Sequence, residues 1–221
     1  MTKRLADFLT ASVLLLLTLP IVVVAAIGSA LVLRAWPFFV QQRVGRDGTA
    51  FRFIKIRTLP TTTPTYLLKS DLCFDEVPRF TRMLRDLHLD ELPQLFLVLT
   101  GRMSLVGPRP EMPEFHHRLP PTFAAARTTV RPGCTGLWQI GAACTGLIGD
   151  APEYDRFYLY NANARLDLWI LARTARMMLG FAGLVKLSDV PEWAVPDDRA
   201  PAVLAPRHEA LVELADADLS A

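Results

Sequence analysis

Hydrophobic residues run almost without interruption from Phe8 to Leu33, and no charged residue lies between them. The segment is longer than the ~20 residues that an α-helix needs to cross a bilayer. Pro20 lies near its middle, where a proline removes a backbone hydrogen bond and kinks a helix. The pattern therefore predicts an N-terminal membrane helix within residues 1–35 that is broken at Pro20.

Basic residues flank this apolar segment on both sides. They are Lys3, Arg4, Arg34, Arg43, Arg46 and Arg52. Because positively charged flanks stay in the cytoplasm, both ends of the segment are expected on the same side of the membrane. A re-entrant helix satisfies this condition if local partners bind the backbone groups that the proline frees. A straight transmembrane span is the alternative.

The rest of the pattern predicts one small domain, residues 36–182, that is α+β and mainly helical. Polar and apolar residues alternate over Phe51–Arg57, which is typical of a β-strand, and Asp47-Gly48 favours a hairpin turn before it. The alternation puts Lys55 and Arg57 on one face, where they could bind a diphosphate. A solvated hairpin edge is the alternative.

Helical patterns occupy the middle and the end of this domain. Arg79–Leu87 is a basic helical segment, and the apolar repeat over Leu92–Leu99 predicts a short helix that ends near Gly101. Glu153–Leu179 is predicted to form one long amphipathic helical region. Its apolar side either lies in the membrane interface or packs on the core.

Composition narrows the class of protein. The net charge is only +2, which gives no general reason to expect nucleic acid, and the hydrophobic content of 51% allows a sizeable core. Cys73, Cys134 and Cys144 form no close pair, so we predict no disulfide framework or structural metal site, and a reducing cytoplasmic compartment. Residues 183–221 are rich in Ala, Pro and acidic residues and are expected to form a flexible acidic tail.

Two adjacent carboxylates, Asp90 and Glu91, stand where the apolar helix is expected to begin. Free N–H groups and the helix dipole attract anions there, and ordinary helix capping is the alternative role. Arg109 follows in the loop Gly107-Pro108-Arg109-Pro110, where the prolines restrict the backbone. A guanidinium held in this way suits phosphate oxygens, and a solvated arginine in a Pro-rich turn is the alternative.

These residues lie in motifs that resemble those of a known family. Asp90–Leu95 and Met103–Glu111 resemble the core signature of the bacterial sugar transferases, small monotopic phosphoglycosyl transferases that start glycan assembly on polyprenol phosphate. Gln42–Gly45 with Lys55–Arg57 resembles their second motif, and Arg131–Gln139 resembles their third. The motifs follow the family's order, and the resemblance covers residues 3–180.

The resemblance implies an enzyme that transfers a phosphosugar from a UDP-sugar to undecaprenyl phosphate and releases UMP. Asp90 is implied as the nucleophile, which forms an aspartyl-phosphosugar intermediate, and Glu91 as a proton carrier or metal ligand. Mg²⁺ is the implied cofactor, with Asp90 and Glu91 as its carboxylate ligands. The implied phosphate- and substrate-binding residues are Lys55, Arg57, Arg85, Arg109, Arg131 and Gln139.

The resemblance also implies partners and a location. The expected partners are a UDP-sugar, undecaprenyl phosphate and membrane phospholipid, without nucleic acid, and a homo-oligomer is left open. The expected location is the cytoplasmic face of the bacterial inner membrane, since the acceptor never leaves the lipid. The identity of the sugar is not predicted.

The chain departs from the family pattern at four places. About one helical turn is missing before Arg85, and His88 stands two residues before Asp90 where Ser is usual. Leu19 stands before Pro20 where Ser is usual, and no Arg follows Gly141 after the third motif. Two alternatives therefore stay open. One is a non-catalytic membrane-associated homologue that acts as a partner in polysaccharide assembly, and the other is a single-span anchored binding domain unrelated to glycans.

Overall fold

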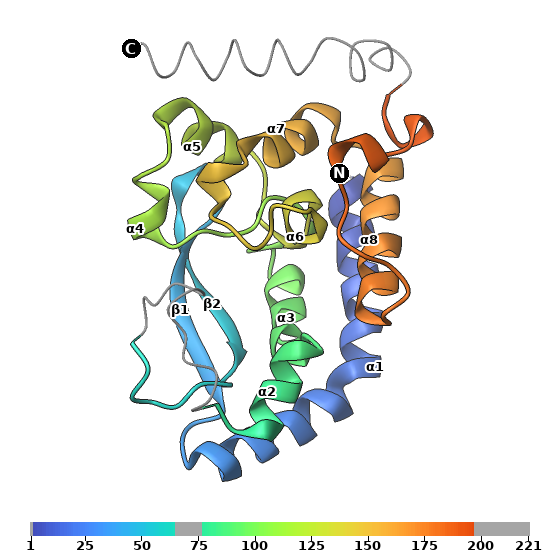
Figure 1. Cartoon of the computed structure of the whole chain (residues 1–221). Helices are drawn as coiled ribbons and strands as arrows, with labels where there is room; N and C mark the ends of the chain where they lie inside the picture. The colour runs from blue at the N-terminus through green and yellow to red at the C-terminus, as the bar shows by residue number, and fades with distance from the viewer. Residues whose placement is uncertain (1, 65–76, 197–221) are drawn as a thin grey trace. The chain divides into compact units, whose positions relative to one another are not determined.

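A computed structural model of the chain describes residues 2–64 and 77–196 (Figure 1). The chain divides into two compact units. The N-terminal unit contains Met1–Arg43 and Ala50–Leu105, and the C-terminal unit contains Val44–Thr49 and Val106–Ala221. The α+β, mainly helical fold class predicted from the sequence is confirmed.

The first element is a helix, α1 (Thr2–Leu33), which begins before the uncharged segment and includes Pro20. It is long and apolar enough to cross a membrane. Figure 1 shows that its direction changes between its two ends. Large apolar side chains are exposed along it, among them Leu16, Leu17, Val24 and Leu31. The predicted N-terminal hydrophobic helix is therefore confirmed.

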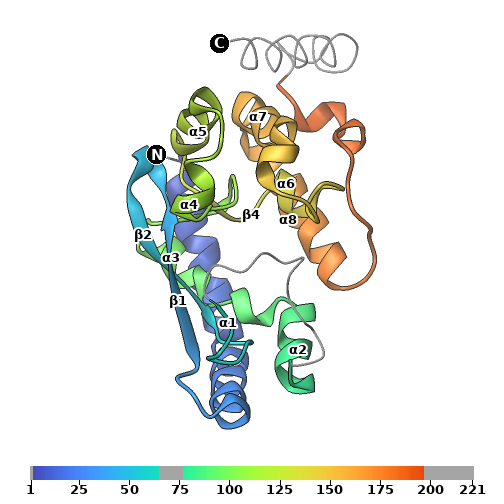
Figure 2. The same cartoon turned by 60° about the vertical axis from the view of Figure 1, so that its left-hand side comes forward.

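A two-stranded hairpin follows, formed by β1 (Phe38–Val44) and β2 (Ala50–Ile56). Between the strands, the short 3-10 turn η1 (Arg46–Gly48) has left-handed backbone at Asp47 and Gly48, as the predicted turn requires. In the N-terminal unit β2 contacts α1, and Figure 2 shows the hairpin beside this helix.

The core of the N-terminal unit joins α1 to the hairpin and to the helices after it. These are α2 (Arg79–Asp86) and α3 (Gln94–Leu99), with the 3-10 turn η4 (Leu89–Glu91) between them. The buried cluster consists of Val22, Ala25, Ile56 and Leu84, and each large apolar side chain of this kind stabilises the fold by roughly 1.5–3 kcal/mol. Gly28 lets Phe80 approach α1, because a Cβ there would lie 2.4 Å from the ring.

Polar residues at the start of α1 bind other elements of the same unit, which the sequence pattern did not predict. Arg4 donates hydrogen bonds to two carbonyls of the last turn of α3, one of them that of Leu99 at 2.8 Å. Asp7 is buried and accepts a hydrogen bond of 2.6 Å from the hydroxyl of Ser104. Because the last carbonyls of a helix lack intrahelical partners, Arg4 satisfies groups that would otherwise be left unpaired.

The C-terminal unit is built from short elements. The strand β4 (Gly133–Thr135) pairs with β3 (Ser104–Val106), whose last residue belongs to this unit. The helices are α4 (Pro113–His116), α5 (Pro121–Thr128), α6 (Leu137–Ile140), α7 (Pro152–Asn161) and α8 (Ala164–Met178), with 3-10 turns η5 (Ile148–Asp150), η6 (Leu187–Asp189) and η7 (Glu192–Ala194). Figures 1 and 2 show α5 beside α7, and the two helices are in contact.

The prediction of one helical region over Glu153–Leu179 is wrong in its continuity. The chain leaves α7 after Asn161 and begins α8 at Ala164. Asn163 has extended backbone, and its side-chain oxygen accepts hydrogen bonds from the N–H groups of two residues in the first turn of α8. An asparagine at this position is a strong N-cap, which explains the break. On α8 itself, Leu166 and Ile170 are buried in the core, whereas Leu168 and Met178 are exposed.

Residues 183–196, which the sequence pattern assigned to the tail, contribute to the C-terminal unit. Val185 is fully buried and its backbone pairs with the N–H of Ala142 (2.8 Å) and the carbonyl of Ile140 (2.9 Å). Val190 and Val195 are also buried. The remaining part of the predicted tail lies outside the described residues, as does Cys73.

Replacement of the α8 cap tests the observed break. Asn163→Ala removes the acceptor for the first turn of α8 and the amide that donates to the carbonyl of Ala194 at 2.8 Å. We expect a loss of about 1 kcal/mol, which corresponds to a melting temperature lower by roughly 2–4 °C. Arg165→Ala, on the exposed side of the same turn, is the control. Equal melting temperatures for Asn163→Ala and the parent chain would contradict the cap.

Candidate functional site

The carboxylate pair lies in the N-terminal unit, in the single 3-10 turn η4 between α2 and α3. His88 has a left-handed backbone (φ 55°), which ends the preceding segment and turns the chain. Asp90 is almost fully buried, with 3% of its surface exposed, and Glu91 is half-buried. The N-cap of α3 is Pro93, without a side-chain cap. The pair therefore precedes the helix, and Asp90 does not have the ordinary capping role.

Burial and neighbouring charges set the electrostatics of Asp90. Burial, followed by the adjacent charge of Glu91, raises the pKa of the Asp90 carboxyl from 3.8 to about 6. Lys55 and Arg85 act in the opposite direction and favour the ionised form. Three elements, β2, α2 and η4, thus bring three predicted site residues, Lys55, Arg85 and Glu91, close to the buried carboxylate of Asp90.

Lys55 and Arg57 occupy the same side of the hairpin, as the alternation along β2 predicted. The ammonium nitrogen of Lys55 lies 5.5 Å from the ring centre of Phe39, and the guanidinium carbon of Arg57 lies 5.8 Å from the same ring. Arg57 also donates its Nε to the carbonyl of Trp36 (3.0 Å). The aromatic ring and this carbonyl restrict the two cationic side chains, which makes them suitable for an anionic ligand.

Arg85 lies in the last turn of α2, close enough to Asp90 to lower its pKa, although about one helical turn of the family pattern is missing before it. One terminal nitrogen of its guanidinium, Nη1, is buried and has no hydrogen-bond partner in the described part of the chain. A buried donor of this kind costs free energy until an acceptor binds it. A phosphate oxygen would satisfy it.

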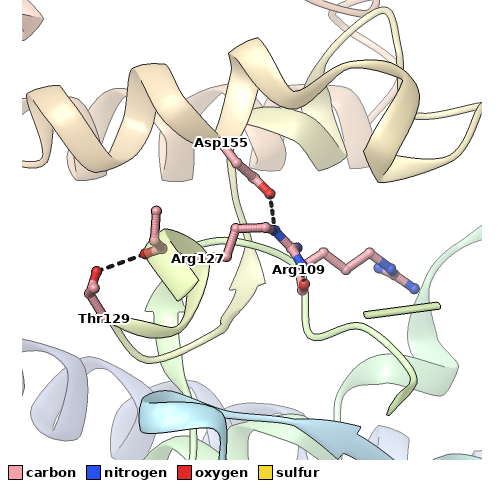
Figure 3. Close-up of polar contacts among 5 residues, drawn as sticks. Arg109, Arg127, Thr129 and Asp155 are labelled. Carbon is pink, nitrogen blue, oxygen red and sulfur yellow. Dashed lines mark hydrogen bonds and ion pairs between the residues drawn. The ribbon is translucent and has the colours of Figure 1, made fainter. Parts of the chain in front are cut away.

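In the C-terminal unit, a backbone contact and a side-chain contact hold the loop that carries Arg109. The carbonyl of Pro108 accepts a hydrogen bond from the N–H of Gly133 (2.9 Å), and the carbonyl of Arg109 accepts one from Nη2 of Arg127 (2.6 Å; Figure 3). Only glycine fits at Gly107, since a Cβ would lie 2.6 Å from a backbone carbonyl oxygen. The arginine is therefore held in a fixed loop, as its flanking prolines predicted.

The third motif lies in the same unit. Arg131 is half-buried just before β4, and Gln139 lies in α6. Both amide atoms of Gln139 are buried without a hydrogen-bond partner among the described residues. An amide with unpaired donor and acceptor suits a ligand that offers both, such as a sugar or a nucleotide base. At the position after Gly141, the N–H of Ala142 instead binds the carbonyl of Val185.

The predicted residues therefore fall into two groups. Asp90, Glu91, Lys55, Arg57 and Arg85 belong to the N-terminal unit, and Arg109, Arg131 and Gln139 belong to the C-terminal unit. Sequence reasoning did not identify the buried ion pair of Arg127 and Asp155 beside Arg109. Residues from α5 and α7 form this pair, and no spacing in the sequence signals the contact.

The position predicted from the sequence for a divalent cation is the pair of Asp90 and Glu91. The described residues contain no cluster of three or more His, Cys, Asp or Glu side chains that would hold a metal without other ligands. Mg²⁺ needs no such cluster, because one or two carboxylates and the phosphates of a substrate commonly bind it. Burial and, after it, the charge of Glu91 raise the pKa of Asp90, and a cation bound to the pair would oppose both effects. The carboxylate pair therefore fits Mg²⁺.

Comparison with known proteins identifies similar chains. The model of the family described as bacterial sugar transferase matches residues 1–180. The sugar transferase EpsL of Bacillus subtilis is 37% identical over 195 residues, which cover 85% of this chain and 92% of that protein. A UDP-glucose:undecaprenyl-phosphate glucose-1-phosphate transferase of Caulobacter vibrioides is 34% identical over 186 residues, covering 80% of this chain and 69% of that protein.

A further relative is much longer than this chain. The UDP-N-acetylgalactosamine-undecaprenyl-phosphate N-acetylgalactosaminephosphotransferase of Aeromonas hydrophila is 34% identical over 188 residues. The match covers 80% of this chain but only 43% of that protein. The similarity therefore extends over most of this chain and, in this relative, over less than half of the protein.

The charges around Asp90 predict that two substitutions shift its pKa in opposite directions. Glu91→Gln removes a like charge and should lower the pKa of Asp90, whereas Lys55→Met removes an opposing cation and should raise it above about 6. Carbon-13 NMR of labelled aspartate carboxyls, recorded without divalent cations, measures both shifts. Arg52→Met, at an exposed position of the same strand, should leave the pKa unchanged. Shifts of the same sign in the first two variants would contradict this arrangement of charges.

Proposed function

Because this chain belongs to the bacterial sugar transferase family, we propose that it transfers a phosphosugar from a UDP-sugar to undecaprenyl phosphate and releases UMP. The observation that carries the proposal is the buried carboxylate of Asp90 with two cationic side chains, Lys55 and Arg85, beside it. The Caulobacter and Aeromonas relatives, whose names describe this type of transfer, support it.

The proposed chemistry has two displacements at one phosphorus atom. A carboxylate oxygen of Asp90 attacks the sugar-bearing phosphate, a new P–O bond forms, and the bond to the UMP oxygen breaks. An oxygen of undecaprenyl phosphate then attacks the same phosphorus and the bond to Asp90 breaks, so the carboxylate is regenerated. The products are UMP and undecaprenyl diphosphosugar. Since only the ionised carboxylate is nucleophilic, Lys55 and Arg85 assist by favouring ionisation.

Glu91 completes the pair. Asp90 and Glu91 would hold Mg²⁺, which neutralises charge on the diphosphate and so lets an anionic nucleophile approach. Glu91 is also placed one residue from the nucleophile, where it can accept the proton of an acceptor phosphate. The two side chains differ in exposure, since Asp90 is buried and Glu91 is half-buried, which supports different roles for them.

Cationic and amide side chains would bind the rest of the donor. In the N-terminal unit Lys55, Arg57 and Arg85 are assigned to phosphate oxygens, and the unpartnered buried nitrogen of Arg85 supports this role. In the C-terminal unit we assign Arg109 and Arg131 to the diphosphate and Gln139 to the sugar or base, and its unpaired amide supports that role. We expect loss of the Arg109 side chain to raise the donor KM without unfolding the protein.

The membrane helix supports the choice of acceptor. We propose that α1 enters and leaves the cytoplasmic face of the bacterial inner membrane, with its exposed apolar side chains in phospholipid. The basic residues on both flanks, the proline within the helix and the change of direction in Figure 1 support a re-entrant path. Such a helix keeps the enzyme at the surface where a polyprenol phosphate presents its head group.

Release of the nucleotide tests the reaction. Protein in detergent with Mg²⁺ and undecaprenyl phosphate is given UDP-glucose, UDP-galactose and UDP-N-acetylgalactosamine in turn. We expect UMP from at least one donor, and a loss of at least ~10³-fold with Asp90→Asn, which keeps the shape of the side chain but removes the nucleophile. Formation of UDP in place of UMP would refute phosphosugar transfer. No product from any donor, with folded protein, would favour the non-catalytic homologue.

Labelling with an impermeant thiol reagent tests the path of α1. Single cysteines are introduced at Lys3 and at Ala35, on either side of the helix, in a chain whose native cysteines are replaced by serine. In spheroplasts neither position should react until the membrane is permeabilised, because both ends are expected in the cytoplasm. Reaction of only one position in intact spheroplasts would indicate a straight transmembrane span.

A further inference from the structure

We propose that Arg127 and Asp155 form a buried positioning pair that fixes the backbone of Arg109 and so directs its guanidinium to the diphosphate of the donor. The inference rests on the proposed function, since it assigns a cause to the placement of a phosphate-binding residue. It concerns only the C-terminal unit, to which all three residues belong.

Both charged side chains of the pair are buried, which carries a free-energy cost. Nε of Arg127 lies 2.7 Å from a carboxylate oxygen of Asp155, and the two residues are 5% and 1% exposed. Charged side chains are rarely buried to this degree, because removing them from water costs several kcal/mol per ion. Burial also raises the pKa of Asp155, whereas Arg127 lowers it. The contact between the two side chains therefore offsets part of the cost of burying them.

Arg127 uses a second arm of its guanidinium for the loop. Its Nη2 donates a hydrogen bond of 2.6 Å to the carbonyl of Arg109 while Nε remains on Asp155. Figure 3 shows both contacts, with the side chain of Arg109 extending away from the ion pair. A planar guanidinium can make the two contacts at once, whereas a lysine ammonium presents a single nitrogen at the end of a flexible chain. The geometry therefore requires arginine.

The loop is already fixed on both sides of Arg109 by backbone contacts. The N–H of Gly133 binds the carbonyl of Pro108 before it (2.9 Å), and the carbonyl of Glu111 after it binds the N–H of Val44 (2.8 Å). The contact with Arg127 falls between these two points, at the residue that carries the phosphate-binding side chain. It is a side-chain contact, so a substitution can remove it and leave the backbone contacts in place.

A neighbouring arginine provides a matched control. The guanidinium carbon of Arg127 lies 5.7 Å from the ring centre of Phe123, and that of Arg156 lies 5.4 Å from the same ring. Arg156 follows Asp155 in α7 and is half-buried. Substitution of Arg156 therefore changes a similar arginine–aromatic contact without removing the Arg127–Arg109 hydrogen bond.

The test compares Arg127→Lys with Arg156→Lys in the full chain. UDP binding is measured by calorimetry, and the donor KM is measured from UMP release. Arg127→Lys should raise both the Kd for UDP and the donor KM by roughly tenfold, the size expected for loss of one charge-assisted hydrogen bond. The KM for undecaprenyl phosphate should not change. Arg156→Lys should change neither the Kd for UDP nor the donor KM. Equal effects on the donor and on undecaprenyl phosphate would overturn the proposal, because they would indicate a general structural defect.

A double-mutant cycle decides whether Arg127 acts through Arg109. In an Arg109→Ala background, Arg127→Lys should have no further effect on UDP binding, since there is no guanidinium left to position. The same loss in both backgrounds would overturn the proposal. If Arg127 and Arg109 are coupled in UDP binding but no UMP is released, phosphosugar transfer is refuted and the positioning role is not. If UMP is released but the two residues are not coupled, the positioning role is refuted and phosphosugar transfer is not.

A second variant separates loss of positioning from misfolding. Arg127→Met combined with Asp155→Leu removes both charges, so no unpaired ion is left in the core, and exchanges of this kind often preserve stability. We expect a cooperative melting transition close to that of the parent chain, together with the weakened UDP binding of Arg127→Lys. Parent-like UDP binding by this folded variant would overturn the proposal.

Discussion

The free-energy cost of burying one carboxylate, that of Asp90, organises much of the N-terminal unit. A carboxylate that is 3% exposed and next to Glu91 remains ionised near neutral pH only if cations lie close to it. Lys55 and Arg85 supply these charges from β2 and α2. The apolar cluster of Val22, Ala25, Ile56 and Leu84 holds these elements together. The hydrophobic core and the buried carboxylate are therefore parts of one arrangement, in which packing against α1 keeps the two cations near Asp90.

Local patterns in the sequence predicted the parts of the site that depend on local physics. The apolar run predicted α1, the alternation along β2 placed Lys55 and Arg57 on one face, and the prolines around Arg109 predicted a fixed loop. The roles of Asp90 and Glu91 are predictions from motif resemblance. The structure shows that Asp90 is buried and that Lys55 and Arg85 lie near it.

Contacts between distant segments could not be predicted in this way. The contacts of Arg4 and Asp7 with the end of α3 and with Ser104 join segments far apart in the chain. The same holds for the pair of Arg127 and Asp155, for which no periodicity exists. The break before α8 differs from these contacts, because Asn163 is a local N-cap signal, but the apolar residues on both sides of it favour one continuous helix.

The contacts of the buried Val185 affect where the chain can be shortened without loss of folding. The family match stops at residue 180, yet the backbone of Val185 pairs with Ile140 and Ala142, and its carbonyl also accepts a hydrogen bond from the hydroxyl of Tyr154 (3.2 Å). A fragment cut at residue 180 would leave these groups without partners beside the helix that carries Gln139. Residues as far as about 196, rather than the limit of sequence similarity, therefore define the smallest fragment expected to fold as the intact chain does.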